Sequence, residues 1–300
     1  MFGSTFTDIT DTLKDIPTSI IMPMKNYDYS REFSIKEEID EESEIIIEGK
    51  ADSFKFFQSD SDYIKVEGKI FISSDDNQKE LKFPELNIVK DGKKIKLISN
   101  GNSVDHYRIE ADIWIPNQMS LECSTKSGNI ETSYISGNSS LHSKLGKIVV
   151  SNHSGNVNTS TKGGTIDIKN HSGDINAEVK NGSLIVNKID GDSNLKCQNG
   201  LIELVEPLGL VNISSKMGTI KVNFGNEIAD KKHSINSKTG IVNLHFKEQS
   251  DAKVIATTKL GNVIVDPIFK NKNGLVKIGD GGPEISVETK IGSITISRYN

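Results

Sequence analysis

Two aspartates with regular spacing are the strongest candidates for acid–base chemistry in this chain. Asp174 and Asp192 lie eighteen residues apart, and each directly follows a glycine. If their segments are neighbouring strands, the carboxylates lie about 4.8 Å apart, and such a pair can cleave glycosidic bonds as general acid and base or nucleophile. Acids beside turn glycines are also ordinary turn formers, and no aromatic platform flanks this pair. A glycan-active hydrolase or lyase is therefore an alternative hypothesis, and we assign no catalytic residue.

Two histidines repeat at the same eighteen-residue interval. His153 and His171 each stand in the sequence Asn-His-Ser-Gly, so their side chains should stack on one face. Two imidazoles so placed can bind a transition metal, but the next equivalent position is Ile189 and supplies no third ligand. Calcium-binding turns of nine-residue repeats need a recurring aspartate, which most turns here lack. We therefore expect a surface histidine ladder, with no metal and no cofactor.

A row of lysines is the main candidate binding surface. Five of its members stand two residues before a glycine, at multiples of eighteen: Lys126, Lys144, Lys162, Lys180 and Lys216. Gln198 interrupts the row, and Lys238, Lys259 and Lys290 preserve the same local sequence further along. A straight row of ammonium groups can bind an extended anionic polymer or the acidic surface of a protein. The alternative is a solvated row that prevents aggregation through the sheet.

These intervals belong to a repeat that dominates the chain. Glycine recurs every nine residues between Gly128 and Gly218 without a slip, which indicates a structural repeat. The full unit has eighteen residues, because alternate glycines share a frame that often reads Thr/Ser-Lys-x-Gly-x-Ile. The glycines of this frame are Gly128, Gly146, Gly164, Gly182, Gly200 and Gly218. Between glycines, apolar and polar residues alternate with period two, as in strands with one buried face.

Each unit predicts one rung of an all-β, parallel β-solenoid (β-helix), with two strands and two turns per rung. Adding eighteen to an apolar position gives a continuous inward row, for example Ile148, Ile166 and Leu184. One row of asparagines is expected to hydrogen-bond from rung to rung as a structural ladder. Its members are Asn158, Asn176, Asn194 and Asn212. The predicted core is a narrow one between two sheets.

The two ends of the chain depart from the regular frame. We expect residues 1–30 to be a poorly ordered lead and residues 31–120, which lack the glycine ladder, to form an irregular antiparallel β cap. Residues 121–300 form the solenoid, continuous with the cap as one domain. Frames at Gly240, Gly261 and Gly292 predict three further rungs in sequence order. Because no cap follows the last frame, end-to-end self-association gives a third hypothesis, a self-assembling structural protein.

Composition disfavours several functional classes. The 300 residues have a hydrophobic content of 35%, which suits a thin solenoid, and a net charge of −5, which disfavours a general binder of nucleic acid or acidic membranes. Arginine is scarce, so bidentate recognition of phosphates or uronates is not expected. No apolar run approaches the ~20 residues of a transmembrane helix, and no export signal or presequence is recognisable. We expect a cytoplasmic protein, with a mitochondrial location as the alternative, and reduced, structural Cys123 and Cys197.

The chain also resembles a known family. The sequence Ile113-Trp114-Ile115-Pro116, followed by Thr125-Lys126-Ser127-Gly128-Asn129-Ile130 and its recurrences, resembles the "putative adhesin" repeat family, the toastrack β-solenoid domain, in its eukaryotic form. The resemblance covers residues 31–300 and implies a right-handed β-solenoid without transferable catalytic residues; the word adhesin is an analogy with β-helical surface proteins. We therefore predict a non-enzymatic scaffold or recognition surface, whose partner is an unknown protein or an anionic polymer.

Overall fold

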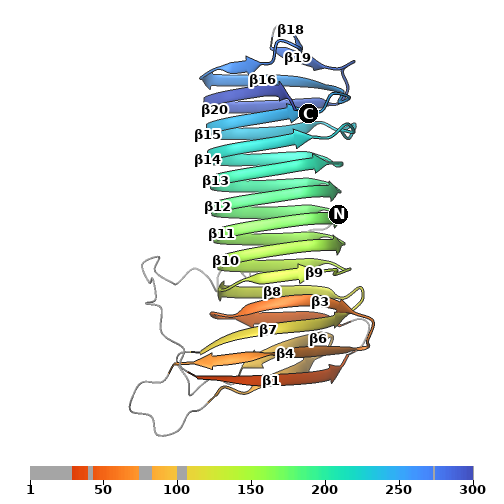
Figure 1. Ribbon diagram of the computed structural model, residues 1–300, viewed down its shortest axis with the longest axis vertical. Coiled ribbons are helices and arrows are strands. Elements are labelled where there is room, and N and C mark those ends of the chain that lie inside the picture. The colour runs from red at the N-terminus through yellow and green to blue at the C-terminus, as the bar shows by residue number, and fades with distance from the viewer. Residues whose placement is uncertain (1–28, 40–42, 74–82, 100–106, 273, 300) are drawn as a thin grey trace.

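The computed structural model describes residues 29–39, 43–73, 83–99, 107–272 and 274–299. The described residues form strands and turns, without a helix, and their rungs stack into one elongated body (Figure 1). Most neighbouring strands are parallel. The predicted all-β parallel solenoid is confirmed. The expected lead, residues 1–30, lies outside the described residues except for Tyr29 and Ser30, which begin the first strand.

Rungs of eighteen residues form the middle of the stack, with one longer step of twenty-two residues from β14 to β15. In most rungs the two expected strands run together as one long strand that bends at a corner glycine. The rungs are β8 (Ser120–Ser127) with β9 (Ile130–Ser133), β10 (Ser139–Ser154), β11 (Val157–Ser172), β12 (Ile175–Asp190), β13 (Ser193–Pro207), β14 (Val211–Phe224) and β15 (His233–Phe246). Each pairs in parallel with the next, so that Gly146, Gly164 and Gly182 lie side by side.

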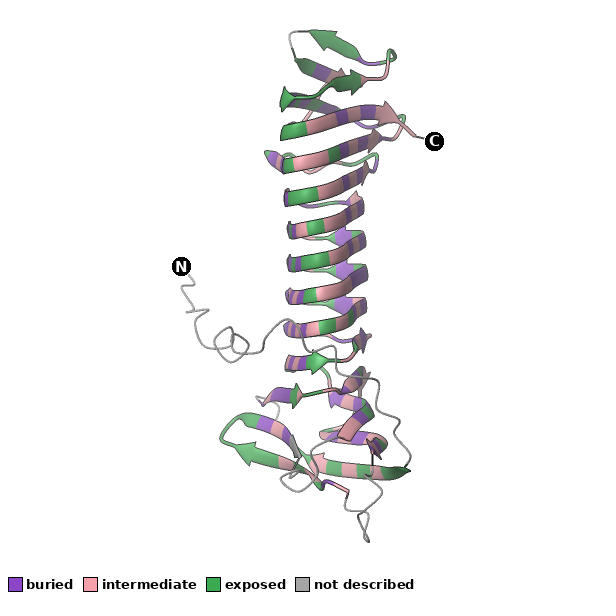
Figure 2. Ribbon diagram, turned by 90° about the vertical axis from the view of Figure 1, so that its left-hand side faces the viewer, coloured by how far each residue is buried: buried purple, intermediate pink, exposed green. Residues whose placement is uncertain are grey.

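The core fills the narrow space between the two halves of each rung. The predicted inward rows are buried, as Ile148, Ile166 and Leu184 show, and buried and exposed residues alternate along each rung (Figure 2). Small residues before the corner also point inward, and the hydroxyls of Thr125, Ser143, Thr161 and Thr258 donate to backbone carbonyls, whereas those of Ser215, Ser237 and Thr289 have no partner among the described residues. Ser143 Oγ, for example, donates to the Gly128 carbonyl of the rung beneath at 3.1 Å, which satisfies a buried polar group.

The corner glycines have no room for a side chain. Gly182 has a φ of +139°, and a Cβ on it would lie 1.9 Å from the carbonyl oxygen of Gly164 in the rung beneath. Gly200 repeats this geometry, with its Cβ position 1.8 Å from the carbonyl oxygen of Gly182. Both the positive φ and the close backbone approach require glycine.

The N-terminal end contains two further rungs, stacked in an order that differs from the sequence. β2 (Glu44–Gly49) and β3 (Ser53–Ser59) pair in parallel with β8 and β9. On their far side, β6 (Lys94–Ser99) and β7 (Tyr107–Pro116) also pair with them in parallel.

Antiparallel pairing at this end involves β1 (Tyr29–Glu38), β4 (Tyr63–Ile72) and β5 (Leu86–Asp91). The interpretation of residues 31–120 as an irregular antiparallel cap is therefore wrong for β2 and β3, whose pairings are all parallel. It is right in part for β6 and β7, which pair in parallel with β2 and β3 and antiparallel with β5 and β4. These strands join the parallel stack without the glycine frame, because strand pairing uses backbone groups that every sequence supplies.

The C-terminal end is interleaved in the same way. β20 (Glu284–Arg298), the last strand of the chain, lies between β15 and the rung formed by β16 (Ala252–Leu260) and β17 (Val263–Val265). The intervening segment forms a hairpin, β18 (Lys270–Lys272) and β19 (Leu275–Ile278), that pairs with β16. The expected sequential order of the last rungs is therefore wrong, and so is the expected open end after Ile296, because the rung of Gly292 is internal.

The corner packing predicts a large effect of one methyl group. Gly182→Ala should lower the free energy of unfolding by more than about 3 kcal/mol, because it combines a strained φ with a backbone clash. Gly225→Ala is the matched control, since the nearest atom to its Cβ position is 3.8 Å away. It should cost less than about 1 kcal/mol. Urea unfolding measures both, and equal midpoints for the two variants would contradict the corner geometry.

Candidate functional site

The predicted lysine row is a single column in the structure. Each member precedes the corner of its rung, and the flanking residues pair in register, as Ser143 with Thr161 does. In rung order the column is Lys126, Lys144, Lys162, Lys180, Gln198, Lys216, Lys238, Lys290 and Lys259. We call these nine residues the lysine stripe. At roughly 4.8 Å per rung, the stripe is about 38 Å long.

The lysine stripe faces solvent. Its lysines are exposed, apart from the half-buried Lys144. Within the part of the chain that the structure describes, seven of them form no ion pair: Lys126, Lys144, Lys180, Lys216, Lys238, Lys259 and Lys290. The adjacent column contains two acids in these rungs, Glu178 and Glu288, each two residues before a lysine of the stripe. The positive charge of the stripe is therefore largely uncompensated.

Sequence reasoning missed one neighbour of the stripe. Gly49 pairs with Thr125, which places Lys50 beside Lys126. The Lys50 ammonium lies 5.9 Å from the centroid of the Tyr107 ring, a cation–π contact. No spacing in the sequence indicates this position, because the rung of Lys50 joins the stack far from its place in the chain.

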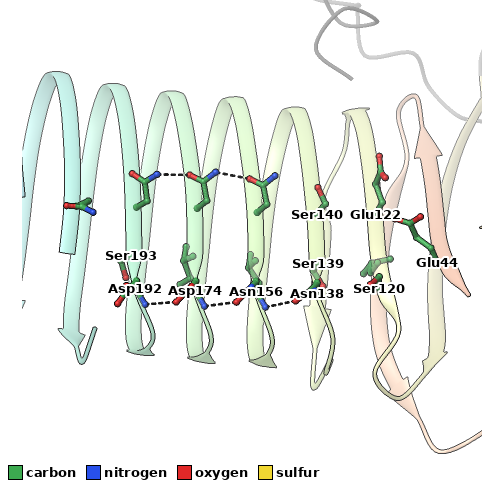
Figure 3. Close-up of a pocket in the computed structure, with 17 residues that line it drawn as sticks. Glu44, Ser120, Glu122, Asn138, Ser139, Ser140, Asn156, Asp174, Asp192 and Ser193 are labelled. Atoms are coloured by element: carbon green, nitrogen blue, oxygen red, sulfur yellow. Dashed lines mark hydrogen bonds between the residues drawn. The ribbon is translucent and has the colours of Figure 1, made fainter. Parts of the chain in front are cut away.

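The asparagine row forms the predicted ladder. Asn176 Nδ2 donates to Asn158 Oδ1, and Asn194 Nδ2 donates to Asn176 Oδ1, both at 3.2 Å. Asn212 pairs with Asn194 in the same column. Figure 3 shows the amides aligned along the stack. Each amide keeps one further N–H that its ladder partner does not use.

A second ladder holds the two candidate catalytic acids. Asp174 Oδ1 accepts the backbone N–H of Asp192 at 2.9 Å, and Asp192 Oδ1 accepts that of Leu210 at 2.9 Å. Asn156 and Asn138 continue this ladder towards β8 in the same way (Figure 3). Each side chain thus caps the turn of the next rung, which is a structural task.

The electrostatics of Asp192 favour its charged form. Lys231 Nζ lies 2.6 Å from Asp192 Oδ1, and this hydrogen bond lowers the pKa of the carboxyl, helped by the N–H of Leu210. A carboxyl that stays ionised at neutral pH is a poor general acid. Asp192 retains the capacity to accept hydrogen bonds or bind a cation.

The two ladders border a shallow groove of about 540 Å³ that runs along the stack. Its lining includes amides, hydroxyls and carboxylates and lacks aromatic side chains. Glu44 and Glu122 lie at its β8 end (Figure 3). The groove brings Asp174 and Asp192 together as predicted, but supplies no stacking surface for a sugar ring.

The histidine pair is buried, so the expectation of a surface ladder is wrong. His153 and His171 are each only 2% exposed, with ring centroids 5.2 Å apart. The left-handed φ angles of Asn152 (51°) and Asn170 (52°) interrupt the alternation of inward and outward residues and turn the next side chain into the core. His153 Nε2 lies 2.8 Å from Ser139 Oγ, while neither ring nitrogen of His171 has a hydrogen-bond partner among the described residues.

Metal and redox chemistry find little support in the described residues. They contain no group of three or more His, Cys, Asp or Glu side chains that could hold a metal ion. Cys123 and Cys197 are free and buried, and burial raises the pKa of both thiols, so they stay protonated. In the same part of the chain, no helix has the length and hydropathy to cross a membrane.

Comparison with known proteins identifies the family. A family model described as Toastrack DUF4097 matches residues 42–297. The chain belongs to the Toastrack DUF4097 family. No curated protein matches it. The expectation of a eukaryotic-type member stays a prediction.

Several solved structures are similar to this Toastrack chain. A "putative adhesin" from Parabacteroides merdae shares 16% identity, with 90% of this chain and 97% of that chain covered and a TM-score of 0.31. A "putative adhesin" from Bacteroides fragilis shares 13% identity over the same fractions, with a TM-score of 0.32. A "putative cell adhesion protein" from Clostridium sporogenes shares 12% identity over 90% and 100%, with a TM-score of 0.21. These TM-scores are too low to support any functional argument.

The buried histidines predict a pH-dependent stability of the Toastrack chain. Burial, and then the charge of the neighbouring His171, lower the pKa of His153 from 6.5 to about 4. Burial also lowers the pKa of His171, against the opposing effect of the backbone and the Asp174 carboxylate. The folded state therefore keeps both rings neutral, while the unfolded chain takes up protons below pH 6.5. Stability is fully present above that pH and is lost as the pH falls towards 4.

The measurement is urea unfolding between pH 7 and pH 4, for the wild type and His153→Ile/His171→Ile. Isoleucine is the matched replacement, because Ile135 and Ile189 occupy the neighbouring positions of the same buried column. The wild type should lose on the order of 3 kcal/mol more than the variant. Identical pH profiles would show that the histidines do not carry this dependence.

Proposed function

We propose that this protein is a non-enzymatic recognition scaffold whose lysine stripe binds an extended anionic polymer. The observation that carries the proposal is the alignment of eight lysines in nine stacked positions, most of them without an ion pair. Membership of the Toastrack DUF4097 family supports a scaffold role. The stripe supplies a specific surface for that role.

The charge arrangement supports a bound polyanion. Stacked lysines repel one another, since two like charges about 4 Å apart cost roughly 1 kcal/mol even in water. A polar residue without charge fits the same position, as Gln198 shows. A charged column therefore costs some stability that a glutamine column would not. A polyanion along the stripe would neutralise this repulsion, and it would be attracted by the lysines of all rungs at the same time.

The shape of the stripe favours a polymer over the acidic surface of a globular protein. A straight column of about 38 Å, at roughly 4.8 Å per charge, matches a linear chain of anionic groups. Lysine is a flexible point charge, unlike the rigid fork of arginine. The stripe should therefore recognise the spacing and density of negative charge more than the identity of each group.

The groove beside the asparagine ladder supports a non-enzymatic role. Asp174 and Asp192 both use a carboxylate oxygen to cap the next rung, and Lys231 holds Asp192 in its charged form. The absence of aromatic residues from the groove lining removes the usual platform for a sugar. The hypothesis of a glycan-active enzyme therefore has weaker support than a scaffold.

Binding of a defined polyanion tests the proposal. We expect the full chain to bind heparin-derived oligosaccharides and poly-L-glutamate, measured by isothermal titration calorimetry at low salt. Lys144→Gln/Lys162→Gln/Lys180→Gln should weaken binding at least about tenfold, because it removes three adjacent charges from the stripe. The variant should fold normally, since glutamine occupies the same position at Gln198.

The matched control removes three exposed lysines outside the stripe that form no ion pair within the described residues, as Lys55→Gln/Lys188→Gln/Lys232→Gln. It has the same net charge as the stripe variant and should bind within about twofold of the wild type. An equal loss of affinity in both variants would contradict the proposal, because binding would then depend on net charge alone. Undiminished binding by the stripe variant would place the site elsewhere.

A further inference from the structure

Ser140 and His142 form a hydrogen-bonded pair at the edge of the groove. Both lie on β10, two residues apart, so their side chains point outward on the same face. Ser140 Oγ lies 2.9 Å from His142 Nε2, and His142 Nδ1 lies 2.8 Å from Ser160 Oγ of the next rung. Ser140 is half-buried and lines the groove (Figure 3). A hydroxyl within reach of a base that a third group orients is the arrangement of an activated nucleophile.

The surroundings of His142 favour the tautomer that activates Ser140. Glu178 follows Ser160 in the same column, on the next rung, and its negative charge favours a proton on Nδ1, the ring nitrogen on that side. Nδ1 then donates to Ser160 Oγ, and Nε2 accepts the hydroxyl proton of Ser140. Burial lowers the pKa of His142 below its ordinary value, so the ring is neutral at pH 7 and can take up a proton.

Asn158 places a hydrogen-bond donor beside the Ser140 hydroxyl. The two residues pair in register on β10 and β11. The asparagine ladder has one direction, because Asn176 Nδ2 donates to Asn158 Oδ1 and Asn194 Nδ2 donates to Asn176 Oδ1. Asn158, the last amide of the ladder, therefore presents its Nδ2 towards the rung of Ser140, where this group has no acceptor among the described residues. A donor so placed can stabilise an oxygen that gains negative charge, as in an oxyanion hole.

A second serine of the same column shows that the fold does not need a histidine here. Ser234 lies in the column of Ser140 and is likewise half-buried. Asn236 follows it by two residues, as His142 follows Ser140, and Asn236 Nδ2 donates to Ser234 Oγ at 2.8 Å. An amide therefore holds the hydroxyl in place without acting as a base. The histidine beside Ser140 adds a proton acceptor that packing does not require.

We propose that Ser140 is a nucleophile that accepts an acyl group from an activated carboxylic ester. Ser140 Oγ attacks the carbonyl carbon while its proton moves to His142 Nε2, and the amide N–H of Asn158 binds the carbonyl oxygen. The bond between the carbonyl carbon and the leaving oxygen then breaks. The leaving oxygen takes the proton from His142 and departs as an alcohol, and the acyl group remains as an ester of Ser140.

The groups around Ser140 favour an uncharged ester over a phosphate. Glu122 pairs in register with Ser140 on the side opposite Asn158, and its negative charge repels a phosphoryl group. One amide donor suits the single oxygen on which charge develops in acyl transfer, whereas phosphoryl transfer spreads its charge over three oxygens. The groove lining lacks aromatic side chains, so the acyl group should be small or polar. The reaction does not involve the lysine stripe, and it stands independently of the polyanion proposal.

Two serine-reactive probes test the proposal on the full chain. p-Nitrophenyl acetate is an activated ester that should acetylate Ser140. A fluorophosphonate should modify the same hydroxyl with loss of fluoride, and its adduct is stable, so rapid loss of the acetyl group cannot hide the reaction. Peptide mass spectrometry locates both adducts. Ser140 should react at least about a hundredfold faster than Ser234, the matched control within the same molecule, because Ser234 lacks a general base.

His142→Asn reproduces the pair of Ser234 and Asn236 at Ser140. The fold should therefore persist, which circular dichroism and thermal unfolding verify. The variant should slow the modification of Ser140 at least about a hundredfold and leave Ser234 unchanged, and Ser140→Ala should remove the adduct from its peptide. Equal rates at Ser140 and Ser234 with both probes in the wild type, or an unchanged rate at Ser140 in His142→Asn, would overturn the proposal.

Discussion

The structure depends on the contact between the corner glycine of one rung and the glycine carbonyl of the rung beneath. At Gly200 the carbonyl oxygen of Gly182 lies 1.8 Å from where a Cβ would be, so no other residue fits this packing. The corner admits one register, because a slip by one residue would place a side chain in that contact. It would also exchange the inward and outward faces of the strand. This constraint therefore sets the alignment of every column of the solenoid.

The surface columns are consequences of the same register. Once the corners are fixed, Asn158, Asn176 and Asn194 must stack, and their amides bond in series. The carboxylates of Asp174 and Asp192 likewise meet the backbone of the next turn. These two ladders satisfy their own hydrogen bonds and stabilise the stack. The lysine stripe has the same alignment, but this alignment adds no stability to the fold, because its members repel one another. This contrast separates the structural columns from the proposed functional one.

The repeat itself could be predicted from the sequence, because eighteen-residue spacing encodes both the period and the inward rows. The order of the terminal rungs could not. β2 and β3 join β8 and β9 without the glycine frame, and β20 enters between two rungs that precede it in the chain. Such pairings depend on backbone hydrogen bonds and on tertiary packing, for which the local sequence holds no spacing signal.

Local backbone geometry explains the other errors and omissions at the candidate site. Simple alternation places His153 and His171 outside, but the left-handed residues before them reverse the phase and bury both rings. The membership of the lysine stripe was predictable from the frame, while its continuation beside Lys50 and the true order of Lys290 and Lys259 required the structure. The exposure of Val263 could not be predicted either, because this residue belongs to an inward row and is exposed only where no further rung covers it.

The most direct test of a functional stripe is the dependence of affinity on polymer length. Heparin-derived oligosaccharides of increasing, defined length can be titrated against the full chain by calorimetry. A straight stripe of about 38 Å, at roughly 4.8 Å per rung, predicts that affinity rises steeply with length until the oligosaccharide spans the stripe. Beyond that length it should rise only slowly. Affinity that does not change with length, from the shortest oligosaccharide onward, would contradict the claim that the stacked lysines act together.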